Sequence, residues 1–169
     1  LDMKQNDRAK IILSSRILSL KKNSIFFNSH ELDGLLFLKS GKLRFFLSSL
    51  DARELPLYYL NNMEVEFFEN FNDKTISTIL DIAFIVEKNS EILLIPYSVL
   101  NLFRDKYSIM EKFLHNLTRE KLSKSLLSLQ NILLIPLKDR LLNFLYSLNK
   151  TEISLTHEEI AKNLGSSRE

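Results

Sequence analysis

The sequence of 169 residues has no cysteine and no tryptophan, and only three residues each of glycine, proline and histidine. Without cysteine the chain forms no disulfide, no thiolate metal site and no cysteine-ligated iron–sulfur cluster. No apolar stretch approaches the roughly 20 residues that cross a bilayer, and no signal peptide is visible. We therefore expect a cytoplasmic protein with no membrane partner.

The composition also argues against an enzyme. The histidines lie far apart, no glycine-rich phosphate loop is present, and no pair of carboxylates has a forced geometry, so neither a catalytic site nor a metal site is indicated. Hydrophobic content of 45% with 26% charged residues is that of an ordinary globular protein.

Residues 24–95 are rich in short aromatic and aliphatic runs that predict strands. The runs lie at residues 25–27, 35–38, 43–47, 55–60, 75–86 and 91–95, with turns expected at 40–42 and 87–90. Short strands separated by turn residues are typical of a sandwich or barrel. Residues 1–22 are expected to be partly helical.

A long helix is predicted from Ser108 to about Leu134, because this run has no proline or glycine and its apolar residues recur at threes and fours. Ser108 and Glu111 have the spacing of a capping box. Such a helix would either lie across its own sheet or pair with its twin across a two-fold axis, and its excess of apolar residues favours pairing. The residues expected at the dimer interface are Met110, Phe113, Leu114, Leu117, Leu122, Leu126 and Leu129.

Pro136 ends this helix, and residues 137–148 are expected to form another amphipathic helix. Residues 156–169 then read T-H-E-E-I-A-K-N-L-G-S-S-R-E, which predicts a helix-turn-helix. Thr156 can cap the first helix with Glu159 reaching back, and Gly165 can supply the left-handed residue that ends it.

The second helix of this motif would be the part that enters the DNA major groove. Ser166 or Ser167 can cap it, with backbone N–H groups that face a phosphate. Arg168 can donate two hydrogen bonds to guanine, and Glu169 can accept one from a cytosine amino group. The sequence stops at the first turn of this helix, so we expect the DNA-reading element to be incomplete. Residues 101–169 carry a net charge of +3 (11 basic and 8 acidic), against −1 for residues 1–100 (12 and 13), which agrees with DNA contact at this end.

The terminal run resembles the T-x-x-E-I-A-x-x-L-G-x-S-R-E pattern of the CRP/FNR family of bacterial transcription regulators. Residues 33–44 are similar to the family's Y-x-L-x-S-G turn, residues 54–60 to its next strand, and residues 91–96 to the strand before its long dimer helix. The resemblance covers roughly residues 20–169.

The resemblance implies an α+β fold in three parts. Residues 1–107 would form a sensor domain, an N-terminal double-stranded β-helix (a β-roll like a cyclic-nucleotide-binding domain). Residues 108–135 would form the dimerisation helix, and residues 136–169 a truncated winged helix-turn-helix. The implied partners are double-stranded operator DNA of palindromic sequence, a second copy of the chain, and RNA polymerase. The implied DNA-binding residues are Thr156, His157, Ser166, Ser167, Arg168 and Glu169.

The effector is not identified by the sequence. Members that bind cyclic nucleotides share a glycine and an arginine in the phosphate cassette, whereas residues 63–75 contain neither and carry four acids, which argues against a cyclic nucleotide. Haem stays open as a cofactor through His30, His115 or Met63, although solvent exposure or core packing explains each of these more simply. Two alternatives remain: a haem-based gas or redox sensor, and a dimeric ligand-binding or interaction module that no longer reads DNA.

Overall fold

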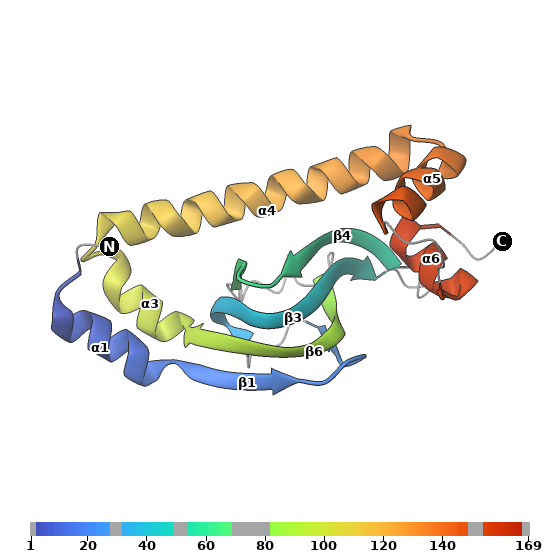
Figure 1. The fold of residues 1–169 in the computed structure, drawn as a ribbon. Coiled ribbons are helices and arrows are strands. Elements are labelled where there is room, and N and C mark those ends of the chain that lie inside the picture. Colours follow the sequence, from blue (N-terminus) through green and yellow to red (C-terminus); the bar gives the residue numbers. More distant parts are fainter. Residues whose placement is uncertain (1–2, 28–31, 49–53, 69–81, 149–153, 167–169) are drawn as a thin grey trace.

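The structure is a computed structural model that describes residues 3–27, 32–48, 54–68, 82–148 and 154–166. A rolled antiparallel sheet lies at the centre, and the long helix α4 (Ser108–Leu134) runs along it (Figure 1). The helices α1 (Gln5–Ser14) and α3 (Tyr97–Arg104) lie at one end of the molecule, and α5 (Leu137–Ser147) and α6 (His157–Leu164) lie at the other. None of the described helices is long and apolar enough to span a membrane.

Two long strands, β3 (Gly34–Ser48) and β6 (Ile82–Pro96), pair with each other from end to end. Each of these two strands also pairs with a further strand on its other side, and that further strand differs between the first and second halves of its length. On β6 these are β2 (Ile25–Phe27) and then β1 (Arg16–Leu20), and on β3 they are β5 (Val65–Phe68) and then β4 (Glu54–Asn61). All these pairings are antiparallel. The predicted α+β class with a double-stranded β-helix is therefore confirmed.

The turn expected at residues 40–42 is wrong, because these residues lie inside β3. The fully buried side chains of β3 are Leu36 and Leu38 in one half and Leu43 and Phe45 in the other, so the alternation changes phase between the halves. A change of phase needs an extra residue, and the pairing with β6 shifts register between Leu38 and Leu43. Gly41 has φ +112, and a Cβ on it would meet the Ser90 side chain at 2.0 Å, so glycine is required at this irregularity.

The turn expected at residues 87–90 is also wrong, since these residues continue β6. Residues 1–22 are partly helical, as expected, because α1 covers Gln5–Ser14, and the segment after it forms β1. The two wrongly predicted turns have one cause. Polar residues on a strand that bends away from the core are indistinguishable in sequence from a turn, and pairing with a distant strand decides the outcome.

The hydrophobic core consists of two clusters. The first fills the rolled sheet, where the Phe45 ring stacks on Tyr58 with centroids 4.7 Å apart and packs against Phe84 at 5.3 Å. The second lies outside the sheet, where α3 and the start of α4 meet, and includes Leu100, Phe103, Met110 and Leu114. Helix α4 thus packs on its own chain through its first turns.

The start of α4 departs from the predicted capping box. Tyr107 is the residue before the helix, and no side chain caps it. Glu111 instead receives two hydrogen bonds from the Arg104 guanidinium at 2.7 and 3.0 Å, and these hold the pKa of Glu111 below its usual value. Arg104, the last residue of α3, therefore binds the Glu111 carboxylate that the capping box would have used.

Candidate nucleic-acid interface

Helix α6 has both of the predicted end signals. The Thr156 hydroxyl accepts from the Glu159 backbone N–H at 3.2 Å, and the Glu159 carboxylate accepts from the Thr156 backbone N–H at 2.7 Å, which completes a capping box. These bonds to the charged form lower the pKa of Glu159. At the other end Gly165 has φ +63 and ends the helix, as predicted.

The corner after α6 is tightly packed. A Cβ on Gly165 would lie 3.0 Å from Ile132 of α4 and 3.0 Å from Pro56 of β4, so a side chain here would be both strained and crowded. Arg140 of α5 donates to the Leu164 carbonyl, which ties α5 to the end of α6. The first helix and the corner of the predicted motif are thus present.

The predicted DNA-binding residues divide into two groups. Thr156 and His157 lie exposed at the start of α6, and Ser166 lies half-buried just after the corner. Ser167, Arg168 and Glu169, including the two residues expected to read bases, lie outside the described residues. DNA binding by all six stays a prediction.

Helix α6 rests on strand β4. We call this the β4–α6 contact and define it by Glu54, Pro56 and Tyr59 of β4 with Lys162, Asn163 and Gly165 of α6 and its corner. The Lys162 ammonium lies 3.3 Å from the Glu54 carboxylate, and the Tyr59 hydroxyl donates to the Asn163 side-chain carbonyl. Burial raises the pKa of Tyr59 to about 12, so its hydroxyl stays a donor at neutral pH. No sequence pattern indicates this contact, because its residues are about a hundred positions apart.

Glu54 is also one end of a buried charge network. Arg44, which is 3% exposed, donates to Glu54 at 2.8 Å and to Glu87 at 2.8 Å, so β3, β4 and β6 are joined by one guanidinium. Burial opposes its charge, but the two carboxylates outweigh that and raise the pKa of Arg44. Glu54 therefore sits between two cations, Arg44 inside and Lys162 outside.

A second polar cluster lies between the sheet and the middle of α4. Glu66 of β5 is 5% exposed, and its carboxylate lies 3.1 Å from the Lys121 ammonium. The buried Tyr58 side chain lines the same small cavity of about 20 Å³, together with Leu117 and Lys124. Burial, and to a smaller extent the negative charge of Glu66, raises the pKa of Tyr58, so the Tyr58 hydroxyl stays protonated. This volume holds about one water molecule.

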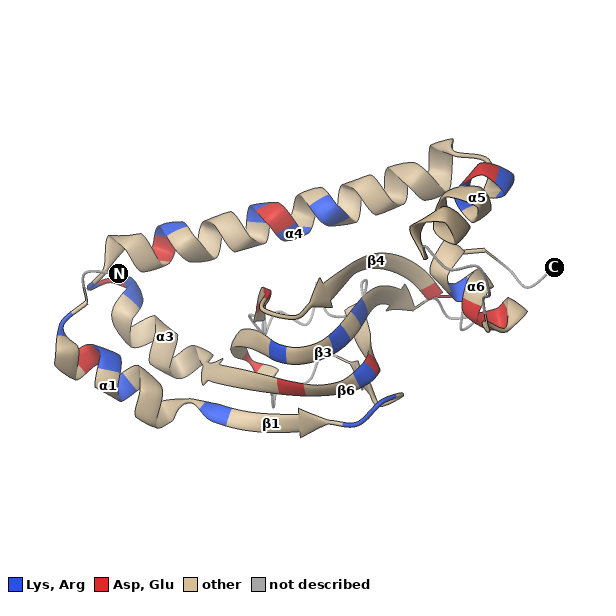
Figure 2. Ribbon diagram, in the orientation of Figure 1, with Lys and Arg blue, Asp and Glu red and all other residues tan. Residues whose placement is uncertain are grey.

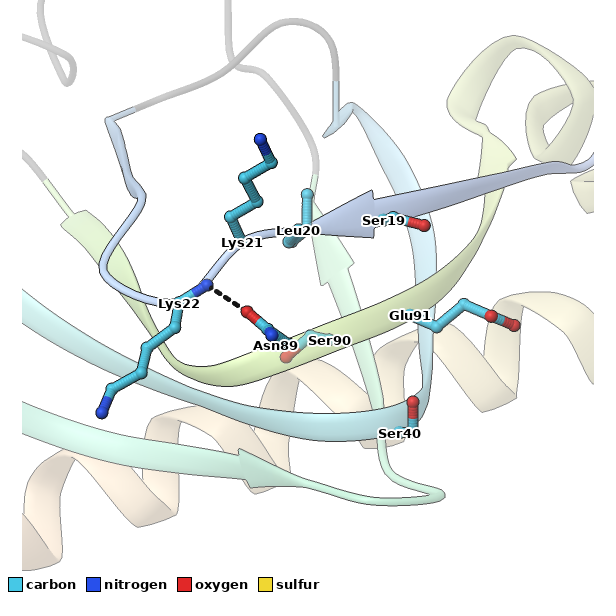
Figure 3. A pocket seen from close by; sticks show the side chains of 8 residues that line it. All are labelled: Ser19, Leu20, Lys21, Lys22, Ser40, Asn89, Ser90 and Glu91. Carbon is cyan, nitrogen blue, oxygen red and sulfur yellow. Dashed lines mark hydrogen bonds between the residues drawn. The ribbon is translucent and has the colours of Figure 1, made fainter.

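A wider surface depression of about 560 Å³ lies at the turn ends of the sheet. The Lys22 backbone N–H donates to the Asn89 side chain there at 2.8 Å (Figure 3). The side chains of Lys21 and Lys22 extend away from each other, so their charges do not converge on one anion (Figure 3). Its lining residues are Ser19, Leu20, Lys21, Lys22, Ser40, Asn89, Ser90 and Glu91.

The predicted dimer residues also divide. Met110 and Leu114 are buried in the second core cluster, and Leu117 is partly buried against it, so their part in a dimer interface stays a prediction. Leu122 and Leu126 are 58% and 56% exposed, Phe113 is 39% exposed, and Leu129 is half-buried. Residues 125–137 carry no charged side chain, which leaves the last third of α4 uniformly tan in Figure 2.

The two candidate haem ligands that the structure describes are not gathered into an apolar pocket. Met63, expected in the core, is instead 69% exposed, and His115 is exposed on α4. His30 lies outside the described residues. Among the described residues no group of three or more histidine or acidic side chains is arranged to hold a metal ion.

The fold matches those of known regulators. A protein from Eubacterium rectale assigned to the CRP/FNR family of transcriptional regulators is 23% identical, with a TM-score of 0.83 over 99% of this chain and 79% of that one. FixK2 from Bradyrhizobium japonicum is 13% identical, with a TM-score of 0.70 over 91% and 79%. The c-di-GMP-responsive global regulator CLP from Xanthomonas campestris is 19% identical, with a TM-score of 0.67 over 98% and 86%. No protein-family model and no curated protein matches the chain. The chain thus has the fold of CRP/FNR regulators.

Proposed function

We propose that this chain, which has the CRP/FNR regulator fold, is a DNA-binding transcription regulator of that type. The observation that carries the proposal is the capped helix α6 followed by a left-handed glycine, the first half of a helix-turn-helix, at the end of a chain with this fold. A regulator of this kind acts where the chromosome is, so a cytoplasmic location and contact with RNA polymerase are part of the proposal.

The proposed DNA contacts begin at α6. The first helix of a helix-turn-helix crosses the DNA backbone, so Thr156 and His157 at its start would approach phosphates. The second helix would then enter the groove with Arg168 and Glu169 against base edges, as the sequence predicts. Ser166 and Ser167 would cap this second helix and present its N–H groups to a phosphate.

The proposed dimer forms through the outer face of α4. Leu122, Leu126, Leu129 and Leu133 follow a 4-3-4 spacing, which is the repeat of a two-stranded coiled coil. Three of these leucines are more than half exposed in the single chain. Two copies paired here would carry two reading helices, which suits a palindromic operator with half-sites about 34–36 Å apart.

The effector is proposed to be something other than a cyclic nucleotide, because residues 63–75 lack the glycine and arginine of the phosphate cassette. CLP is described as responsive to c-di-GMP. In the present chain a small-molecule effector that entered between the sheet and α4 would have to displace Lys121 or Lys124, since the cavity there is close to the size of one water molecule.

The test is DNA binding by the protein encoded by the full reading frame. Selected operator sequences would be obtained from random duplexes, and binding measured by fluorescence anisotropy over a range of salt concentrations. Arg168→Ala should lose about 1–3 kcal/mol of specific binding and keep its non-specific binding. The absence of any sequence preference in wild type would refute the proposal. Native mass and absorption spectra of the same sample would identify a retained effector or haem.

A further inference from the structure

Helix α6 is held against the sheet by three kinds of contact at once. Lys162 pairs with Glu54, Tyr59 donates to Asn163, and Gly165 packs between Pro56 and Ile132. The capping bonds lower the pKa of Glu159 most, and the positive charge of Lys22, on the turn after β1, lowers it further. The start of α6 therefore lies near the turn end of the sheet. Figure 1 shows α6 lying at this end of β3 and β4.

Lys162 is the one lysine or arginine on α6, and carboxylates on both sides occupy it. Its ammonium lies 3.3 Å from Glu54 and 3.4 Å from Glu158. Burial alone would lower the pKa of Lys162, but these carboxylates outweigh it and raise the pKa. The ammonium is therefore charged and already paired.

A helix that crosses the DNA backbone attracts phosphates through its lysines and arginines. With Lys162 shared between Glu54 and Glu158, α6 presents a net negative charge from its acids Glu158 and Glu159, which repels a phosphate. Glu54 and a DNA phosphate thus compete for the same ammonium group. Because Glu54 stays anchored by Arg44, it holds its position whether or not Lys162 is there.

We propose that the β4–α6 contact is an autoinhibitory one, in which Glu54 takes the place of a DNA phosphate against Lys162 and Tyr59 fixes α6 in an arrangement that excludes DNA. This rests on the proposed function and adds its regulation. The contact opens before DNA binds, and a signal that moves β4 or α4 controls the opening.

The contact is weak enough to open. The Lys162 side chain is 40% exposed and that of Glu54 11%, so the pair lies at the edge of the surface, where an ion pair shifts an equilibrium by about 1.5- to 5-fold. A neutral hydrogen bond such as that of Tyr59 contributes about 2- to 12-fold. Loss of both should raise the ratio of open to closed forms by about 3- to 60-fold.

Opening can be measured without DNA. The chain has no native cysteine, so Lys88→Cys on β6 and Tyr146→Cys on α5, both exposed, provide two unique sites for spin labels. Pulsed electron resonance on the labelled wild type should give one narrow distance distribution. Tyr59→Phe and Lys162→Gln should each add a second, shifted population, and the matched control Lys162→Arg should not. Identical distributions for all four proteins would overturn the proposal.

DNA binding then separates the two roles. In the full reading frame, Tyr59→Phe opens the contact and keeps Lys162, so its operator affinity should rise by about 2- to 12-fold. Lys162→Gln opens the contact but loses a phosphate partner, so its affinity should fall and its salt slope should decrease by about 1. An unchanged affinity of Tyr59→Phe, with label distances that respond, would refute the inhibitory role. If no form binds DNA while the distances still respond, the DNA function itself fails and the contact has nothing to inhibit.

Discussion

The outer face of α4 gives a quantitative test of the proposed dimer. Leu126 is 56% exposed, and full burial of a leucine side chain contributes about 1.5–3 kcal/mol. Burying the exposed half at both copies of Leu126 should therefore stabilise the dimer by about 2–3 kcal/mol. Leu126→Asp removes this term, so the dimer dissociation constant should rise by about 30- to 150-fold. Burial of a carboxylate in the interface would add to the loss.

Sedimentation equilibrium measures the dissociation constant directly. The matched control is Leu102→Asp, which changes an equally apolar side chain, 73% exposed on α3, that lies outside the proposed interface. The control should dissociate like wild type. A Leu126→Asp protein that dimerises as tightly as wild type would show that this face of α4 is not the interface. A dimer lost in the control as well would show that the interface lies elsewhere or extends to α3.

Three further outcomes follow from packing and charge. Gly165→Ala should reduce the stability of α6 by about 1–2 kcal/mol because an alanine at positive φ is strained, and faster amide exchange in α6 would measure the loss. Gly165→Asn should lose less stability, because asparagine tolerates this conformation. Equal losses for the two variants would point to crowding alone. Glu66→Gln leaves Lys121 without its carboxylate partner. Because the Lys121 side chain is 26% exposed, the free energy of unfolding in urea should fall by about 1–3 kcal/mol rather than by the full cost of a buried pair. The control Glu120→Gln, at a side chain that is 60% exposed, should change little. Asp7 accepts hydrogen bonds from Lys106 and Tyr107, which lower its pKa. Its stabilising contribution is therefore present above the ordinary aspartate pKa of 3.8 and is lost as the pH falls below that value. Asp7→Asn should flatten the fall of the melting temperature at acid pH, and an unchanged fall would contradict this.

Features that depend on neighbouring residues were predictable from the sequence. The Thr156 capping box and the left-handed Gly165 need only residues within one or two turns, so their spacing is sufficient. Parts of β2, β3, β4 and β6 were also predictable from short aromatic and aliphatic runs, whereas β1 and β5 were not predicted. The same reasoning failed at Ser108, where Arg104 of the preceding helix takes the Glu111 carboxylate.

Features that depend on distant residues were not predictable. Residues 40–42 resemble a turn, and only their pairing with β6 keeps them in a strand. Met110 and Leu114 have the helical spacing of an interface, yet α3 and the chain's own core cover them first. Glu54 and Lys162 form an ion pair, although sequence patterns predict that charged residues such as these are exposed to solvent. Apolar spacing shows which side of a helix is buried, but it does not identify the surface that buries it.

The different ways in which α4 is attached along its length have a mechanical consequence. Its first turns are fixed by hydrophobic packing, whereas its middle is attached through the ion pair of Lys121 with Glu66 and the hydrogen bond from Ser128 to the Pro56 carbonyl at 2.6 Å. A movement of α4 about its packed end near Leu114 would therefore break the polar contacts of its middle first. From that pivot to Leu134 the arm is about 30 Å, and a tilt of about 5° would carry its far end through about 2.6 Å. Because Ile132 packs closely on Gly165, a displacement of this size would disturb the corner after α6.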